Sequence, residues 1–399
     1  MQPLPCPAVI SRSIARRSAV LALLPLGLIL AAAPRHLPAQ EQAKPAWKYS
    51  ADMLRPFWLG NVMQGESVLF VKDEKTGEGR ASVLFPIDRV LSVSSSSGEM
   101  QYEEGRDYVW KAGSREIIVP AGSRIVVSKP DALRRPAGSQ KYRLTHRDGN
   151  GEIYFGAKLE YHDIQTIVSY THAQGLWKTP VPKFDADALP GTLKKLQNRE
   201  PVKIVVLGDS ISTGCNASGW ADGMPFQPAY PDLLGRMLQE KYKGPVTVTN
   251  LSVGGMDSAW GLTQVDKVVE AAPDLVLIAF GMNDSAGRPA ADFQDKIAAT
   301  IKAIREKRPG AEFILIATMV GNPGWATLKQ ELFPQYRDAL AKLSGPGVAL
   351  ADVTSVWGEF LKLKHDWDQT GNGVNHPNDF GHRVYAQVIG SLLIPGEGK

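Results

Sequence analysis

The second half of the chain is patterned as strands that alternate with helices. From residue 202 onward, short apolar runs alternate with longer segments in which apolar residues recur at helical spacing, as in Phe293, Ile297, Ile301 and Ile304. Apolar strands joined by amphipathic helices predict a parallel sheet with helices on both faces. Strands are expected at 203–207, 246–250, 274–280, 312–318 and 348–352, and helices at about 231–242, 258–271, 291–307, 327–343, 354–363 and 380–393.

The first half has a different pattern. Residues 50–177 contain many short apolar or alternating runs, separated by turn signals such as Asp148-Gly149-Asn150-Gly151. This spacing predicts an all-β sandwich or jelly-roll domain, which either binds carbohydrate or braces the second domain. Residues 178–201 are rich in proline and are expected to link it to an α/β domain at 202–395.

The first 39 residues have the features of an export signal. Arg12, Arg16 and Arg17 precede an apolar stretch from Ala19 to Ala33, and Ala39 is a small residue at the expected cleavage position. The alternative is a membrane anchor, but the stretch is shorter than the ~20 residues that span a bilayer. We therefore predict a signal peptide at 1–39 and a periplasmic or secreted protein without a stable membrane span.

The charge of the chain depends on this segment. Four of the 45 basic residues lie in the first 39 positions, which contain no acid, so the remainder carries 41 basic and 41 acidic residues. A neutral chain without a basic run gives no reason to expect nucleic acid as a partner.

Polar residues follow the expected strands at their carboxyl ends. The first strand runs into Gly208-Asp209-Ser210, Gly255 follows the second, the third runs into Asn283, and His376 precedes the last helix. In a parallel sheet these segments share one edge. Ester hydrolysis needs a hydroxyl nucleophile, a base and donors for the developing oxyanion, which Ser210, His376, and the Gly255 N–H with the Asn283 amide supply. Gly-Asp-Ser alone is a common turn, so the prediction depends on all four segments.

Over residues 202–393, these four segments resemble, in order, the motifs of the SGNH (GDSL-type) hydrolases. The resemblance implies a flavodoxin-like, three-layer sheet of order 2-1-3-4-5. It implies Ser210 as nucleophile and His376 as general base. The oxyanion hole would consist of the Ser210 and Gly255 N–H groups and the Asn283 side chain, and no metal or cofactor would take part.

One position departs from the family pattern. The family usually has an aspartate three residues before the histidine, where this chain has Gly373. Asp368 is our candidate for the acid that orients His376, and Asp366 lies in the same loop. A backbone carbonyl is the alternative and would leave a Ser–His dyad. His382 lies inside the expected last helix, where a structural role is expected rather than that of the base.

The substrate prediction depends on aromatic residues and on architecture. Aromatic faces near the sheet edge stack on sugars or hold an acyl chain, although packing explains each one equally well. The two-domain organisation resembles carbohydrate esterases with an N-terminal β-sandwich. The leading hypothesis is an exported serine esterase that removes O-acyl, chiefly O-acetyl, groups from a small-molecule or polysaccharide ester. The alternatives are a lipid or thioester hydrolase and, because of Gly373, a non-catalytic carbohydrate-binding protein. The aromatic candidates are Trp220, Trp260, Trp325 and Trp367.

Overall fold

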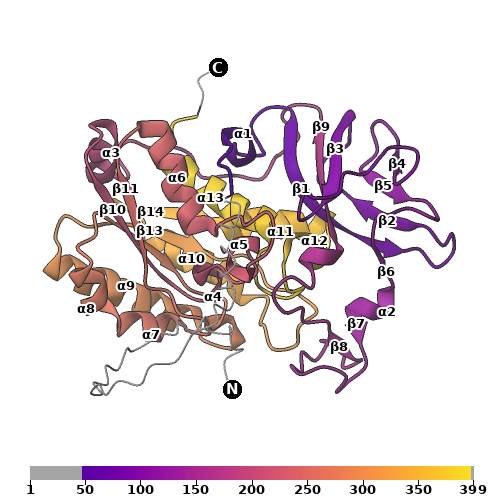
Figure 1. The fold of residues 1–399 in the computed structure, drawn as a ribbon. Coiled ribbons are helices and arrows are strands. Elements are labelled where there is room, and N and C mark those ends of the chain that lie inside the picture. The colour runs from indigo at the N-terminus through magenta and orange to yellow at the C-terminus, as the bar shows by residue number, and fades with distance from the viewer. Residues whose placement is uncertain (1–46, 397–399) are drawn as a thin grey trace, which may run out of the picture.

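The computed structural model describes residues 47–396, which form a β-rich domain beside an α/β domain (Figure 1). The expected signal peptide at 1–39 lies outside the described residues. Within 47–396, no helix combines the length and the apolar character needed to cross a bilayer. The boundaries expected at 50–177, 178–201 and 202–395 stay predictions.

The α/β domain contains a five-stranded parallel sheet. Its spatial order is β11 (Val246–Asn250), β10 (Val202–Gly208), β12 (Leu275–Ala279), β13 (Glu312–Ala317) and β14 (Val348–Asp352). This is the order 2-1-3-4-5, so the predicted flavodoxin-like sheet is confirmed. Along β10, Ile204 and Val206 pack into one core while Val205 and Leu207 pack into the other. Both faces are buried, which explains why this strand is continuously apolar.

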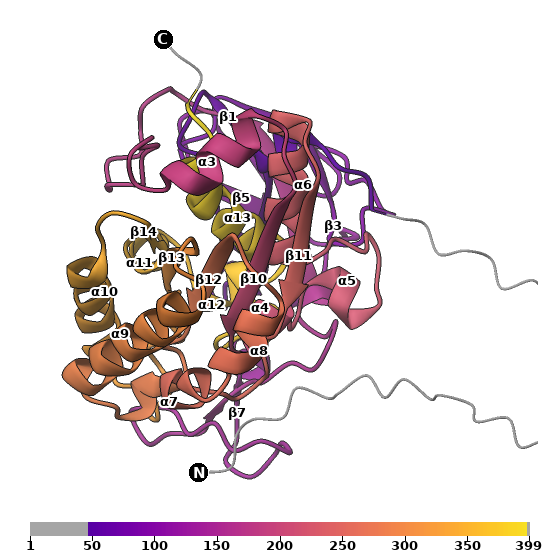
Figure 2. The same ribbon diagram turned by 90° about the vertical axis from the view of Figure 1, so that its left-hand side faces the viewer.

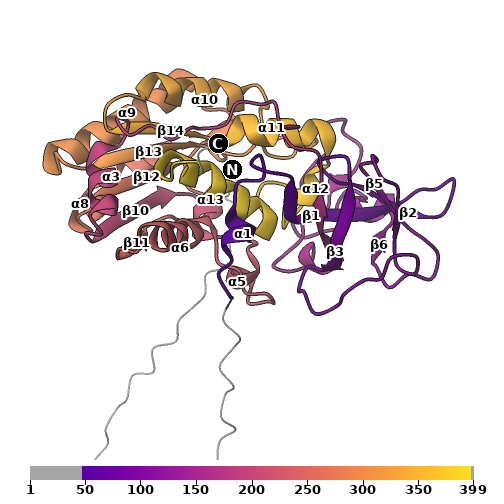
Figure 3. The ribbon, with the colours of Figure 1, turned by 90° about the horizontal axis from the view of Figure 1, so that it is seen from above.

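Helices cover both faces of this sheet. Figures 2 and 3 show α9 and α10 on one side and α6 and α13 on the other. The longer helices are α6 (Tyr230–Tyr242), α9 (Ala290–Lys307), α10 (Leu332–Leu343), α11 (Val353–Leu363) and α13 (Asp379–Leu393). The shorter ones are α3 (Pro190–Gln197), α4 (Ser210–Thr213), α5 (Ser218–Ala221), α7 (Ser258–Leu262), α8 (Val265–Glu270), α12 (Asp366–Gln369) and the 3-10 turn η2 (Asp284–Ala286).

The β-rich domain is built around the long strand β1 (Val62–Lys72). The strands follow the path β3 (Arg89–Ser95), β9 (Gln165–Thr171), β1, β2 (Gly79–Ser82), β5 (Glu116–Val119) and β4 (Val109–Trp110), and β6 (Val127–Ser128) also pairs with β1. Strands β7 (Arg134–Arg135) and β8 (Glu152–Ile153) form a separate pair, and short helical turns occur at α1 (Ala51–Leu54), α2 (Pro130–Leu133) and η1 (His162–Ile164). A β-rich first domain is thus confirmed, whereas its description as a sandwich or jelly roll stays a prediction.

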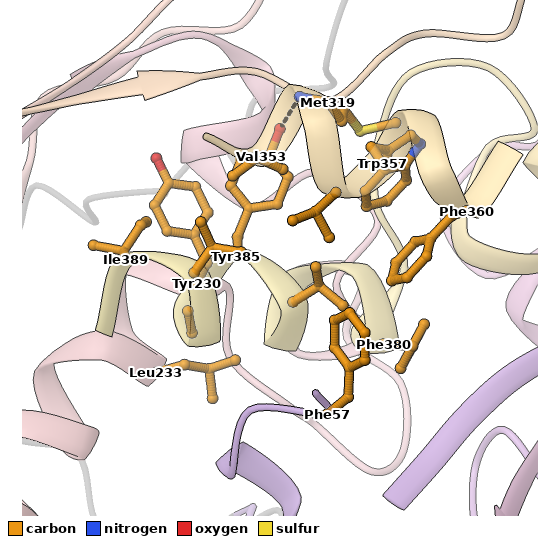
Figure 4. Packing of buried hydrophobic residues seen from close by; sticks show 14 of the residues in the cluster. Phe57, Tyr230, Leu233, Met319, Val353, Trp357, Phe360, Phe380, Tyr385 and Ile389 are labelled. Atoms are coloured by element: carbon orange, nitrogen blue, oxygen red, sulfur yellow. Dashed lines mark hydrogen bonds between the residues drawn. The ribbon is translucent and has the colours of Figure 1, made fainter. Parts of the chain in front are cut away.

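The hydrophobic core is continuous between the two domains. Phe57, which precedes β1, packs against Phe360 of α11 with ring centroids 5.3 Å apart. Phe360 in turn stacks on Phe380 of α13, and Figure 4 shows this cluster continuing to Trp357 and Tyr385. The domains therefore form a single packed body around the end of α11.

Candidate active site

Ser210 lies at the carboxyl end of strand β10, which is paired with β11 and β12, and is the first residue of α4. Gly208 permits the tight turn, because a Cβ there would lie 2.4 Å from Ser212 Oγ and 2.7 Å from the Ala279 carbonyl oxygen. The Asp209 carboxylate caps α4 by accepting a hydrogen bond from the Ile211 N–H at 2.9 Å. Ser210 is 5 % exposed, so the turn presents an almost buried hydroxyl.

His376 meets this hydroxyl. Its Nε2 lies 2.9 Å from Ser210 Oγ, and its side chain comes from the loop that enters α13. Burial lowers the pKa of His376 from 6.5 to about 4. The imidazole is therefore neutral at neutral pH and is free to accept the Ser210 proton.

An asparagine that the sequence analysis missed fixes the backbone before His376. Asn372 is fully buried, and its Oδ1 accepts hydrogen bonds from three consecutive N–H groups, those of Val374, Asn375 and His376, at 2.9–3.1 Å. The His376 carbonyl accepts from the Gly371 N–H at 2.9 Å. An asparagine followed by a glycine is the sequence signal for such a local turn.

The partner of the second ring nitrogen is Asn216, and not the acid we expected. His376 Nδ1 lies 2.9 Å from Asn216 Oδ1. Asp368 instead accepts hydrogen bonds from the Leu69 N–H in β1 at 2.8 Å and from the His365 N–H at 2.9 Å, which hold its carboxylate against the other domain. The candidate acid Asp368 is thus wrong, and so is the alternative of a backbone carbonyl.

A contact with the β-rich domain explains why position 373 is a glycine. A Cβ at Gly373 would lie 2.1 Å from Tyr161 Oη and 2.9 Å from the Tyr154 carbonyl oxygen, and the glycine has a φ of +75°. Tyr161 is buried and stacks on Tyr154 with ring centroids 5.2 Å apart. The space that the family's aspartate needs is therefore filled by a tyrosine from the other domain.

We predict that restoring this acid damages the protein. Gly373→Asp is expected to lower the free energy of unfolding by about 3 kcal/mol or more, because the overlap with Tyr161 adds to the backbone strain. Gly175→Asp is the matched control, since Gly175 has a φ of +73° and nothing lies within 4 Å of its Cβ position. Urea unfolding of both variants separates the cost of the overlap with Tyr161 from the cost of an aspartate at positive φ. An equal loss in the two variants would contradict this account of Gly373.

The two other oxyanion candidates lie on neighbouring strand ends. The loop after β11 runs along β10, where the Val253 N–H donates to the Gly208 carbonyl at 3.1 Å. Asn283, after β12, donates from Nδ2 to the Met256 carbonyl at 2.8 Å and so holds the turn that contains Gly255. Ser210, Gly255 and Asn283 thus belong to three adjacent strand ends at one edge of the sheet.

His382 has the environment of a structural histidine. It lies within α13, and its ring stacks on Tyr230 with centroids 6.3 Å apart. Burial lowers its pKa to about 3. Among residues 47–396, no group of three or more His, Cys, Asp or Glu side chains is arranged to hold a metal ion.

The four tryptophans differ in burial. Trp325 is buried in the larger core. The other three are partly exposed. Trp367 packs with Leu69 and Tyr161 and stacks on His365, Trp260 of α7 lies edge-on to Phe280, and Trp220 lies in α5. Contact of these rings with a substrate stays a prediction.

A protein-family model matches most of the α/β domain. The model of the GDSL-like Lipase/Acylhydrolase family matches residues 206–384, a range that contains Ser210, Gly255, Asn283 and His376. No curated protein matches the chain.

Among solved structures, the chain is similar to a two-domain esterase active on acetylated mannans, with 19 % identity, a TM-score of 0.42 and 52 % of each chain covered. The match therefore spans about half the length of that esterase. It is also similar to the lipase Lip_vut3 from goat rumen metagenome, with 17 % identity, a TM-score of 0.39, and 47 % of this chain and 95 % of that chain covered. The lipase/acylhydrolase from Enterococcus faecalis gives 24 % identity and a TM-score of 0.37 over 47 % of this chain and 93 % of that chain. Because these values are low, the family assignment depends on the family match and on the motifs.

Proposed function

Residues 206–384 belong to the GDSL-like lipase/acylhydrolase family, and on this premise we propose that the protein, an ester-bond hydrolase, is a serine esterase that removes O-acetyl groups from a carbohydrate. The observation that carries the proposal is the 2.9 Å hydrogen bond between Ser210 Oγ and the buried, neutral His376. A nucleophile paired with a base is the arrangement that acyl transfer needs.

The proposed reaction has two steps. Ser210 Oγ attacks the acyl carbonyl while His376 Nε2 takes the hydroxyl proton, and the oxyanion is stabilised by the N–H groups of Ser210 and Gly255 and the amide of Asn283. The tetrahedral intermediate collapses, the alcohol leaves with the proton from His376, and the acyl group stays on Ser210. Water then attacks the acyl-enzyme while His376 Nε2 takes a proton from it, and His376 returns this proton to Ser210 Oγ as the bond between Oγ and the acyl carbon breaks and the carboxylic acid is released.

The proposed acetyl group and sugar are supported by the surroundings of the serine. Ser210 and His376 are only 5 % and 8 % exposed, which favours a short acyl group over a long chain. The partly exposed rings of Trp220 and Trp260 suit contact with a sugar face. A lipid or thioester hydrolase with the same residues is the second candidate. The alternative of a non-catalytic binding protein was based on the missing aspartate at position 373. Packing against Tyr161 accounts for Gly373, so this observation no longer favours that alternative.

The test is a chain-length and polymer series. Wild-type protein is assayed on p-nitrophenyl esters from acetyl to palmitoyl, and acetate release is measured from acetylated mannan and acetylated xylan. We expect the acetyl ester to be cleaved fastest and at least one polymer to release acetate. A rate that increases with chain length would support the lipid hydrolase, and no turnover of any ester would overturn the esterase proposal.

The pH profile is expected to extend unusually far into the acid range. Only neutral His376 accepts the serine proton, so activity is lost as the pH falls through its folded-state pKa of about 4. The values of kcat/KM at pH 5 should then be about nine-tenths of the plateau, whereas a histidine of pKa 6.5 would leave roughly 3 %. The titratable group that interacts with His376 is His382 of α13, which is itself neutral in this range.

This profile needs a folding control. Because the folded-state pKa of His376 lies below its unfolded value of 6.5, the unfolded chain binds the proton more tightly between pH 6.5 and 4, and stability falls as the pH falls through that window. Tryptophan fluorescence at each pH would show that the protein is still folded. A half-maximal rate near pH 6.5 with intact fluorescence would contradict the lowered pKa of His376.

We also propose export, with removal of residues 1–39. The support is the basic segment and apolar stretch at the N-terminus. N-terminal sequencing of the protein from the periplasm or medium of an expressing bacterium should begin at Gln40. An unprocessed N-terminus at Met1 would contradict this.

A further inference from the structure

We infer that Asn216 is the positioning residue for the catalytic histidine, and that the β-rich domain holds Asn216 in place through the carbonyl of Lys158. This inference deepens the proposed function and rests on it. It assigns to the first domain a direct part in the site, in addition to bracing the fold.

The orientation of the Asn216 amide is fixed by its donors. Nδ2 donates to the Lys158 carbonyl and to the Gly371 carbonyl, both at 2.9 Å. An amide nitrogen has two hydrogens, and both are used in these bonds. The oxygen must then face the remaining neighbour, which is His376 Nδ1 at 2.9 Å.

This orientation selects the tautomer of His376. An amide oxygen only accepts, so Nδ1 must carry the ring proton, and the lone pair of Nε2 then faces Ser210 Oγ. A general base needs this arrangement, since the wrong tautomer presents a donor to the nucleophile. Asn216 therefore performs the orienting role that the family's aspartate has, but without a negative charge.

The backbone around Asn216 is shaped for this contact. Asn216 has a φ of +66°, in the left-handed region that asparagine adopts more readily than most residues. A Cβ at Gly371 would lie 2.5 Å from the Asn216 Cβ, so a glycine is required for the His376 loop to approach. Asn216 is 7 % exposed, so solvent has little access to these hydrogen bonds.

Residues 156–161 of the β-rich domain contact this site, and Gln165 of the same domain donates from Nε2 to the Thr370 carbonyl at 2.8 Å. The Lys158 carbonyl accepts from Asn216, and the Gly156 N–H donates to the Asn372 carbonyl at 3.1 Å. Asn372 is the residue whose side chain fixes the backbone of His376. Tyr161 fills the space beside Gly373. Residues 156–161 thus contact the orienting amide and the histidine loop and fill the space of the usual acid.

The test compares Asn216→Gly, Asn216→Asp and Asn322→Ala. Glycine removes the side chain without straining the positive φ. Aspartate keeps an acceptor for Nδ1 and adds a charge. Asn322 is the matched control. Its Nδ2 also donates to the loop of His376, to the Gly373 carbonyl at 2.8 Å, but Asn322 does not bond the imidazole.

We expect Asn216→Gly to lower kcat by about 10²-fold or more with little change in KM, because the histidine is no longer held in one tautomer. Asn216→Asp is expected to retain more activity and to move the acid limb of kcat/KM upward by about one to three pH units, since a carboxylate favours the imidazolium. Asn322→Ala is expected to leave the acid limb where it is. The Nδ1 proton signal of His376 in the NMR spectrum should be lost in Asn216→Gly alone.

The outcomes separate this inference from the proposed function. If wild-type protein hydrolyses esters and Ser210→Ala does not, the esterase proposal holds. If Asn216→Gly then keeps the wild-type kcat, acid limb and imidazole proton, the positioning role is overturned while the esterase proposal stands. If the wild-type protein hydrolyses nothing, both are overturned.

Discussion

Ser210→Ala is expected to lower kcat for p-nitrophenyl acetate by about 10⁴-fold or more, because no other group can form the acyl-enzyme at that position. His376→Ala should have a similar effect, since the hydroxyl loses its base. Pre-steady-state acyl-enzyme formation should disappear in Ser210→Ala, and a fluorophosphonate probe should label the wild-type protein alone.

The double variant gives the sharper test. Residues that act as one unit show non-additive losses, so Ser210→Ala with His376→Ala should be no slower than either single variant. Ser212→Ala is the matched control in α4, because Ser212 Oγ is hydrogen-bonded to Tyr230 Oη, whereas the ring nitrogens of His376 bond Asn216 and Ser210. Additive losses, or a Ser210→Ala variant with the wild-type rate, would show that hydrolysis occurs at another site.

The strand ends of the site were predictable because they depend on local periodicity. The apolar run of β10 identifies a strand buried on both faces, and a parallel sheet puts its carboxyl end beside that of β12. Ser210 and Asn283 follow directly from that geometry. The prediction of His376 depended on the motif before α13, because the geometry of a parallel sheet does not determine the position of a loop that leads into the last helix.

The residue that orients His376 was not predictable, because the contacts that place Asn216 beside it come from the other domain. Asp368 is close to His376 in sequence and carries the expected charge, but its carboxylate is taken by the Leu69 N–H of β1. From the sequence alone, Asn216 has the features of an ordinary turn residue. Its role depends on the hydrogen bond to the Lys158 carbonyl, which the sequence does not indicate. Contacts of this kind join positions far apart in the chain, and sequence periodicity contains no information on them.

The same limit applies to the tryptophans. An indole in a loop has the same sequence signal whether it faces solvent or a neighbouring domain. Trp367 packs on Leu69 from β1, which only the interface between the domains determines. The domain interface therefore determines both the hydrogen-bond partners of Asp368 and the packing of Trp367.

That interface contains a buried ion pair. Lys364, just after α11, is bonded to Glu66 of β1, and both side chains are fully buried. Lys364 Nζ also donates to the Ser67 carbonyl at 3.0 Å, while Glu66 accepts from the Leu84 N–H and the Tyr170 hydroxyl. Residues of the β-rich domain thus supply the hydrogen-bond partners of both buried charges, at the point where α11 of the α/β domain ends.

Lys364→Met is expected to lower the free energy of unfolding by about 3–5 kcal/mol, because it leaves the Glu66 carboxylate buried without its counter-charge. The loss would be measured by urea unfolding at pH 7, followed by fluorescence and circular dichroism. Adding Glu66→Gln to Lys364→Met should recover part of the loss, because the amide removes the unpaired charge while keeping an oxygen for the Leu84 N–H. The double variant is therefore expected to be more stable than Lys364→Met alone.

Lys362→Met is the matched control on α11. Lys362 forms an exposed pair with Glu359, its side chain being 71 % exposed, so its loss should be below about 1 kcal/mol. Equal effects of Lys362→Met and Lys364→Met would mean that the buried pair does not stabilise the interface. A large effect of Lys364→Met alone, together with a loss of esterase activity at denaturant concentrations that leave the wild-type protein active, would show that the buried pair between β1 and the end of α11 stabilises the active, folded protein.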